Sequence, residues 1–109
     1  MSTRKYELRI LPLFEDDLNE IISYIAGTLR NPKAASDFVS EVEKAINGRV
    51  QSTEVFEQYA NIAEHEYPYY TIRVKNYTVF YVVIPEGSSK VMEVRRLLYS
   101  RRIFSSSLI

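Results

Sequence analysis

The stretch YTIRVKNYTVFYVVI, residues 70–84, decides the fold. Its first part is apolar at every second position from Tyr70 to Val74, which is the period of a strand with one apolar and one basic face. Asn76 is a turn residue, and residues 77–84 are β-branched or aromatic on both faces, which is typical of a central strand. The stretch therefore predicts two neighbouring strands of one sheet.

A further strand is expected over residues 91–98, after the turn-forming residues 85–89. Strict alternation along it would place Arg96 on the same side as Val94 and Leu98. The opposite side would then carry two charged residues, Glu93 and Arg95.

The N-terminal part adds a strand and a helix. Tyr6, Leu8 and Ile10 alternate with charged residues and predict a half-buried strand. Apolar residues at three- and four-residue spacing then predict an amphipathic helix over about 13–29, with Pro12 in its first turn.

A second helix is expected over about 32–50, with Asn31 as its N-cap and Pro32 at its first position. Two helices joined by so short a link pack as an antiparallel hairpin. We expect five residues to bind this hairpin to the sheet as core, without a functional role: Leu18, Ile21, Ile25, Phe38 and Val42.

The order strand, helix, helix, strand, strand, strand predicts a single α+β domain over residues 1–109. The antiparallel helical hairpin should pack on one face of a mostly antiparallel four-stranded sheet. The other face would be free and would carry Arg73 and Lys75. Residues 51–67 are expected to form a loop, and residues 105–109 to fray.

Charge is sorted along the chain although the formal net charge is zero. Residues 1–68 carry 7 Lys/Arg and 12 Asp/Glu, whereas residues 69–109 carry 7 Lys/Arg and 2 Asp/Glu. The second segment is a candidate docking surface for phosphates or for an acidic partner, and its interleaved tyrosines suit RNA. The alternative is an ordinary tyrosine-rich sheet face with solvated charges.

Several classes of site are excluded by composition. The chain has no cysteine and a single histidine, His65, so disulfides, a thiol nucleophile and a Cys- or His-rich metal site are ruled out. We expect no metal and no cofactor, and a surface role for His65. No apolar run approaches the ~20 residues that span a membrane, and the N-terminus lacks a signal-peptide core. A cytoplasmic location is expected.

Five pieces carry a resemblance over nearly the whole chain: the strand before Pro12, DLNEIISYI (17–25), the second helix with Ala34, Ala35 and Phe38, RVKNYTVFY (73–81), and RLLYSRR (96–102). In their order and spacing they resemble the RelE/ParE superfamily of bacterial toxins from type II toxin–antitoxin systems. The resemblance implies a compact toxin with an acidic, partly disordered cognate antitoxin, and it allows a toxin–antitoxin hetero-oligomer. RelE-like members cut mRNA on the ribosome, and ParE-like members poison DNA gyrase. The shared fold does not decide between the two.

The resemblance also implies site residues. RNA cleavage by 2′-hydroxyl attack needs a base, an acid and cations around the phosphate, and no metal. Arg101 matches the arginine that follows the last strand of RelE-like nucleases. Arg73 matches a basic residue on their second strand, and Tyr99 matches a position that is aromatic or histidine in other members. Four further residues are expected to bind RNA or antitoxin: Lys75, Tyr77, Arg95 and Arg102.

One position departs from the nuclease pattern. RelE-like nucleases usually carry an arginine after the tyrosine of the third strand, whereas Tyr77 is followed here by Thr78. The long helical hairpin is also closer to the ParE branch. We expect ribosome-associated mRNA cleavage first, because the basic strand face and its tyrosines fit RNA. Gyrase inhibition is the second alternative, because Thr78 replaces that arginine. A non-toxic member that only binds antitoxin is the third.

Overall fold

A computed structural model describes residues 6–54 and 67–101 of the chain. Its elements are, in order, β1 (Tyr6–Ile10), α1 (Pro12–Ser23), the π-helical turn η1 (Tyr24–Thr28), α2 (Pro32–Arg49), the 3₁₀ turn η2 (Val50–Ser52), β2 (Tyr70–Val74), β3 (Tyr77–Glu86) and β4 (Ser89–Tyr99). His65, Arg102 and the expected frayed tail lie outside the described residues.

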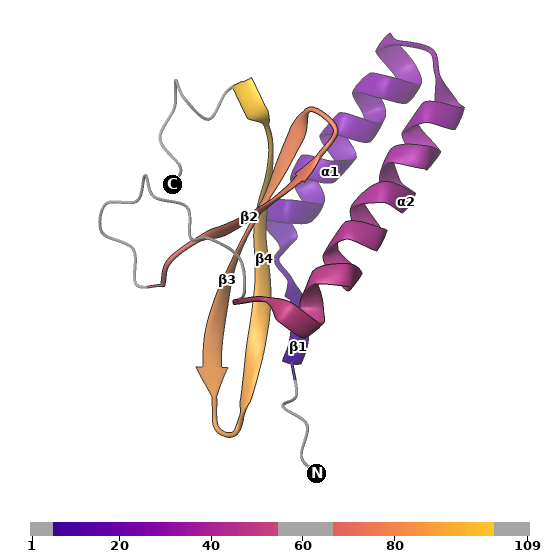
Figure 1. Cartoon of the computed structure of the whole chain (residues 1–109). Helices are drawn as coiled ribbons and strands as arrows, with labels where there is room; N and C mark the ends of the chain where they lie inside the picture. The colour runs from indigo at the N-terminus through magenta and orange to yellow at the C-terminus, as the bar shows by residue number, and fades with distance from the viewer. Residues whose placement is uncertain (1–5, 55–66, 102–109) are drawn as a thin grey trace.

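The four strands form one sheet in the order β1-β4-β3-β2. The β3 strand pairs antiparallel with both β2 and β4, and β1 pairs parallel with β4. Figure 1 shows the two helices running side by side along one face of this sheet. The expected α+β fold is therefore confirmed, with one parallel pairing in a mostly antiparallel sheet. In the described part of the chain, no helix is long and apolar enough to cross a membrane.

Local sequence signals define the helical hairpin. Pro12 opens α1, and the side-chain oxygen of Asn31 accepts a hydrogen bond from the backbone N–H of Ala34 at 3.1 Å, which caps α2 as expected. Beyond Ser23 the first helix continues as a π-helical turn, η1, which the three- and four-residue spacing did not predict.

The main core lies between the helical hairpin and the sheet. Phe14, Phe38, Val42 and Ile46 of the helices are buried against apolar residues of β2, β3 and β4. The prediction that Phe38 and Val42 are core residues is confirmed. The other three expected core residues are only partly buried at the margin of the cluster: Leu18, Ile21 and Ile25.

The other face of the sheet is not free, contrary to expectation. It carries a second apolar cluster in which Phe80 and Val82 are 0% exposed. The ring of Tyr69 packs edge-on against Phe80, with 5.9 Å between the ring centroids. The physical reason is that β3 is apolar on both sides, so both of its faces have to be buried.

A β-bulge changes the register of β4. Phe80 pairs with Arg96, but Tyr81 pairs with Val94, so Arg95 is an extra residue in β4. Val94 therefore packs in the main core, whereas Leu98 packs against the second cluster. The prediction that Arg96 shares one side with both of these residues is wrong, because the extra residue interrupts the alternation.

Candidate binding groove and basic sheet end

A groove of about 960 Å³ lies between the helical hairpin and one end of the sheet. Its lining residues reach the end of β4 and the connection between α1 and α2, which lie at the same end of the molecule (Figure 1). Its helical wall includes Ile21, Tyr24, Ile25, Leu29 and Phe38 together with the acidic residues Asp17, Glu20 and Asp37, and its sheet wall includes Tyr77, Leu97 and Tyr99. The groove is thus walled largely by apolar and aromatic side chains.

Part of this apolar wall is accessible to solvent. Tyr24 is 50% exposed and Leu29 is 54% exposed. On the sheet wall, the Tyr77 ring contacts the rings of Phe38 and Tyr99, with centroid distances of 5.2 and 5.5 Å. Exposed apolar groups gathered around a groove are a feature of surfaces that bind another chain.

An ion pair ties the two walls together. Asp17 on α1 accepts hydrogen bonds from Nε and a terminal nitrogen of Arg96, at 2.8 and 3.0 Å. It also accepts the backbone N–H of Leu97 at 2.9 Å. The hydrogen bond to Asp17 raises the pKa of Arg96 above its ordinary value. This contact fixes α1 against β4 beside the groove, as charge-assisted hydrogen bonds of this geometry do.

The sheet ends beside the groove in a tight turn. Lys75 and Asn76 join β2 to β3, and Lys75 adopts a left-handed backbone conformation with φ of 54°. Arg73 donates from Nε to the carbonyl oxygen of Lys75 at 3.1 Å. Ser100, directly after β4, donates its backbone N–H to the carbonyl oxygen of Asn76 at 2.8 Å. These bonds connect the β2–β3 turn to the end of β4.

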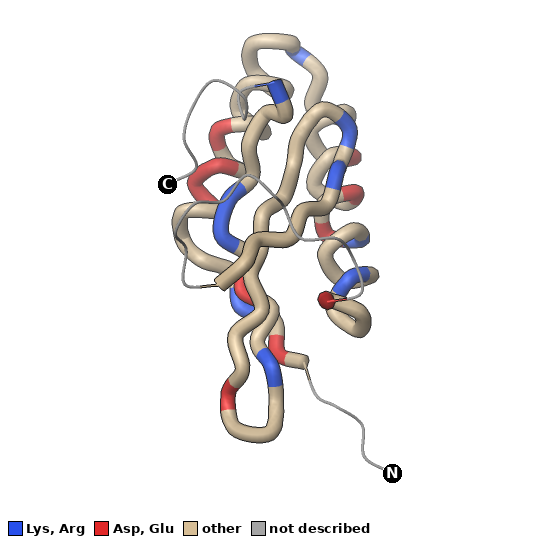
Figure 2. The backbone as a smooth tube through the Cα atoms, turned by 60° about the vertical axis from the view of Figure 1, so that its left-hand side comes forward, with Lys and Arg blue, Asp and Glu red and all other residues tan. Residues whose placement is uncertain are grey.

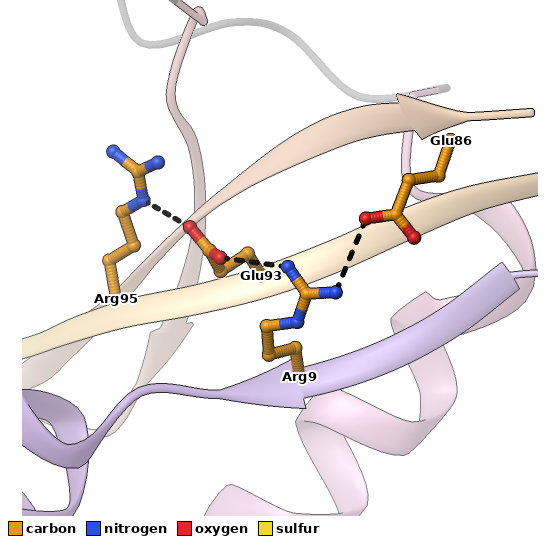
Figure 3. Close-up of polar contacts among 4 residues, drawn as sticks. All are labelled: Arg9, Glu86, Glu93 and Arg95. Carbon is orange, nitrogen blue, oxygen red and sulfur yellow. Dashed lines mark hydrogen bonds and ion pairs between the residues drawn. The ribbon is translucent and has the colours of Figure 1, made fainter.

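Two cations farther along the sheet, Arg9 and Arg95, form ion pairs with carboxylates. Glu93 lies between Arg9 and Arg95 at 3.3 and 2.8 Å, and Arg9 also contacts Glu86 at 3.4 Å (Figure 3). Hydrogen bonds to Glu86 and Glu93 raise the pKa of Arg9. Burial lowers the pKa of Arg95, but hydrogen bonds to Tyr69 and Glu93 outweigh it and raise the pKa. Arg95, expected to bind RNA or antitoxin, therefore belongs to an ion-pair network within the sheet.

The expected catalytic residues do not come together on one side of the sheet. Arg73 pairs with Thr78, which in turn pairs with Leu98 of the second cluster. Tyr99 pairs with Tyr77, which packs in the main core on the helix side. Arg73 and Tyr99 are thus on opposite faces of the sheet.

The remaining expected residues lie around the groove and the sheet end. Tyr77 is half-buried in the sheet wall of the groove, and Arg101 is exposed just beyond β4. Lys75 lies in the β2–β3 turn and lines the groove, so the expectation that it shares a free face with Arg73 is wrong. The turn ends the strand at Val74, and the alternation of β2 does not extend to Lys75.

Two features of the site were not anticipated. The predicted helix over about 13–29 includes Tyr24 and Leu29, but its apolar spacing did not indicate that both remain exposed along the groove. Asp17 lies in the same predicted helix, and nothing local indicates its contact with Arg96, 79 residues away. Among the described residues, no group of three His, Cys, Asp or Glu side chains could hold a metal ion.

Comparisons with known proteins assign the family. A family model described as "ParE toxin of type II toxin-antitoxin system, parDE" matches residues 8–104. One similar solved structure is the RelB–RelE antitoxin–toxin complex from Methanococcus jannaschii, with 18% identity, a TM-score of 0.44, and coverage of 89% of this chain and 95% of that chain. No curated protein matches. The family model covers most of the chain, which is a toxin of a type II toxin–antitoxin system and belongs to the ParE toxin family.

Proposed function

We propose that this toxin arrests growth by binding DNA gyrase and does not cut RNA. The observation that carries the proposal is the position of Arg73 and Tyr99 on opposite faces of the sheet. Cleavage by 2′-hydroxyl attack needs an acid, a base and cations around one phosphate. Arg73 and Tyr99 leave the sheet from opposite faces, which disfavours a shared contact with one phosphate.

Thr78 supports the same proposal. It occupies the position at which RelE-like nucleases usually carry an arginine, and it cannot supply a positive charge. Its hydroxyl is within 2.8 Å of the hydroxyl of Ser100, so it makes a structural hydrogen bond between β3 and the end of β4. The match to a ParE family model favours the gyrase branch as well.

The groove is the proposed docking surface of the cognate antitoxin. Its exposed apolar wall, with Tyr24 and Leu29, fits the apolar side of an amphipathic segment. Lys75, which lines the groove, would attract acidic residues of that segment, whereas Glu20 and Asp37 on the helical wall would attract basic ones. An antitoxin that folds onto this groove buries apolar surface and pairs its charges in one step. Affinity should therefore fall as the salt concentration rises.

Purified toxin tests the proposal with two substrates in parallel. Incubation with gyrase and plasmid should block supercoiling and trap broken DNA, and added antitoxin should reverse both effects. Ribosome-bound mRNA should stay intact with wild-type toxin and with a Thr78→Arg variant, since that arginine alone would not complete a nuclease site. Cut mRNA with untouched gyrase would contradict the proposal, and toxin without effect on either substrate would favour a member that only binds antitoxin.

A further inference from the structure

Three cations at the sheet end have no ion pair among the residues that the structure describes: Arg73, Lys75 and Arg101. Among the other described cations, five contact a carboxylate (Arg9, Lys33, Lys90, Arg95 and Arg96), whereas the exposed Arg30 and Lys44 of the helical hairpin do not. All three cations of the sheet end are exposed. Figure 2 shows basic positions at the β2–β3 turn and at the end of β4, at the same end of the sheet.

Backbone contacts hold these cations in place. Arg73 is fixed over the turn because its Nε donates to the carbonyl oxygen of Lys75, which leaves its two terminal nitrogens for another acceptor. The N–H of Ser100 bonds to Asn76 and positions the following residue, Arg101, beside the same turn. Less side-chain freedom is then lost when an anion binds.

Lys75 occupies a position that is unfavourable for a lysine. Its φ of 54° lies in the left-handed region, where glycine and asparagine are tolerated and other residues are strained. A lysine nevertheless occupies this position in the β2–β3 turn. Arg30, in the link between the two helices, has the same conformation with φ of 53°.

We propose that the sheet end binds the phosphate backbone of duplex DNA through Arg73, Lys75 and Arg101. The inference rests on the proposed gyrase function, because gyrase would present DNA to the bound toxin. Lysine and arginine are the side chains that most often contact DNA phosphates. Each contact releases counterions and makes the affinity salt-dependent.

The arrangement of the cations favours DNA over an acidic peptide. Lys75 lines the groove, but Arg73 lies on the opposite face of the sheet, and Arg101 follows the end of β4. A peptide lying in the groove would leave Arg73 unpaired. The three cations thus lie on and beside the β2–β3 turn, where a broad polyanion such as a duplex could reach all of them.

The test is fluorescence anisotropy of a labelled 30-base-pair duplex, with toxin alone, between 50 and 200 mM KCl. Three phosphate contacts should weaken wild-type binding about 40-fold over this range. The salt-induced weakening of binding should be about 3.5-fold smaller in each of three variants: Arg73→Gln, Lys75→Gln and Arg101→Gln. Lys44→Gln on the exposed face of α2 is the matched control and should leave the salt dependence unchanged.

A Lys75→Asn variant separates a binding role from a structural one. Asparagine tolerates the left-handed conformation, so the melting temperature should stay the same or rise while DNA binding weakens. An unchanged salt dependence in all three glutamine variants would overturn the inference. So would tighter binding of single-stranded RNA, or of poly-glutamate, through the same cations. Because gyrase is absent, this result is independent of the gyrase assay.

Discussion

The carboxylate of Asp17 on α1 accepts two hydrogen bonds from the guanidinium of Arg96 on β4, at 2.8 and 3.0 Å. The same carboxylate accepts the N–H of Leu97 at 2.9 Å. The β1 strand ends at Ile10, opposite Val94, so this N–H lies on β4 beyond the reach of β1. Asp17 therefore accepts a backbone N–H of β4 that β1 does not pair, and it holds the helical hairpin beside that part of the sheet.

Asp17→Asn should lower the free energy of unfolding by about 1.5–3 kcal/mol, because it weakens hydrogen bonds to a charged, partly buried partner. Asp16→Asn, at an exposed neighbouring position, should change it by no more than about 0.5 kcal/mol. Urea denaturation of both variants measures the difference. Equal stabilities of the two variants would show that the contact with Arg96 does not hold the hairpin.

The main core and the groove wall should respond differently to truncation. Ile46 is 5% exposed in the main core, and Ile46→Ala should cost about 2–5 kcal/mol. Ile25 is only partly buried and lines the groove, so Ile25→Ala should cost less. Thermal unfolding of the two variants checks the order. A larger loss for Ile25→Ala would mean that the hairpin packs more deeply at the groove than described.

Tyr81 should give the protein an alkaline limit of stability. Its hydroxyl donates to the carbonyl oxygen of Thr53 at 2.7 Å and accepts from Arg49 at 2.9 Å. Burial raises its pKa above the ordinary 10.0, against the opposing effect of Arg49. The folded state therefore holds the phenolic proton more tightly than the unfolded chain does. This contribution is complete below about pH 10 and is lost as the pH rises through the folded pKa.

Tyr81→Phe should cost about 1–3 kcal/mol at neutral pH and flatten the fall in stability above about pH 10. Tyr24→Phe removes an exposed hydroxyl and should retain the wild-type pH profile. Unfolding free energies measured from pH 7 upward distinguish the variants. The account of Tyr81 fails if the alkaline fall is as steep in Tyr81→Phe as in the wild type.

The groove should dominate antitoxin binding. Leu29→Ser removes an exposed apolar side chain from the groove and should weaken antitoxin binding about tenfold or more, since burial of a leucine contributes about 1.5–3 kcal/mol. Leu13→Ser is the control, because Leu13 is 46% exposed on α1 but does not line the groove. Titration calorimetry with the antitoxin compares them. Equal affinities would place the antitoxin elsewhere.

The sequence predicted the elements whose signals are local. The alternation of Tyr70, Ile72 and Val74 and the Asn31 cap correspond to observed structure because each depends on neighbouring residues. The bulge at Arg95 was not predictable, since one extra residue in a strand has no distinct signature in this sequence. The groove depends on how the hairpin lies against the sheet, which the distant Asp17–Arg96 contact helps to fix.

The most direct test of the gyrase proposal is made in cells during the first minutes after toxin induction. DNA breaks and the integrity of ribosome-bound mRNA are measured together while growth stops. The account predicts that DNA breaks accumulate, that a gyrase inactivated beforehand prevents them, and that mRNA remains intact. Growth arrest with early mRNA cleavage and no gyrase-dependent breaks would contradict it.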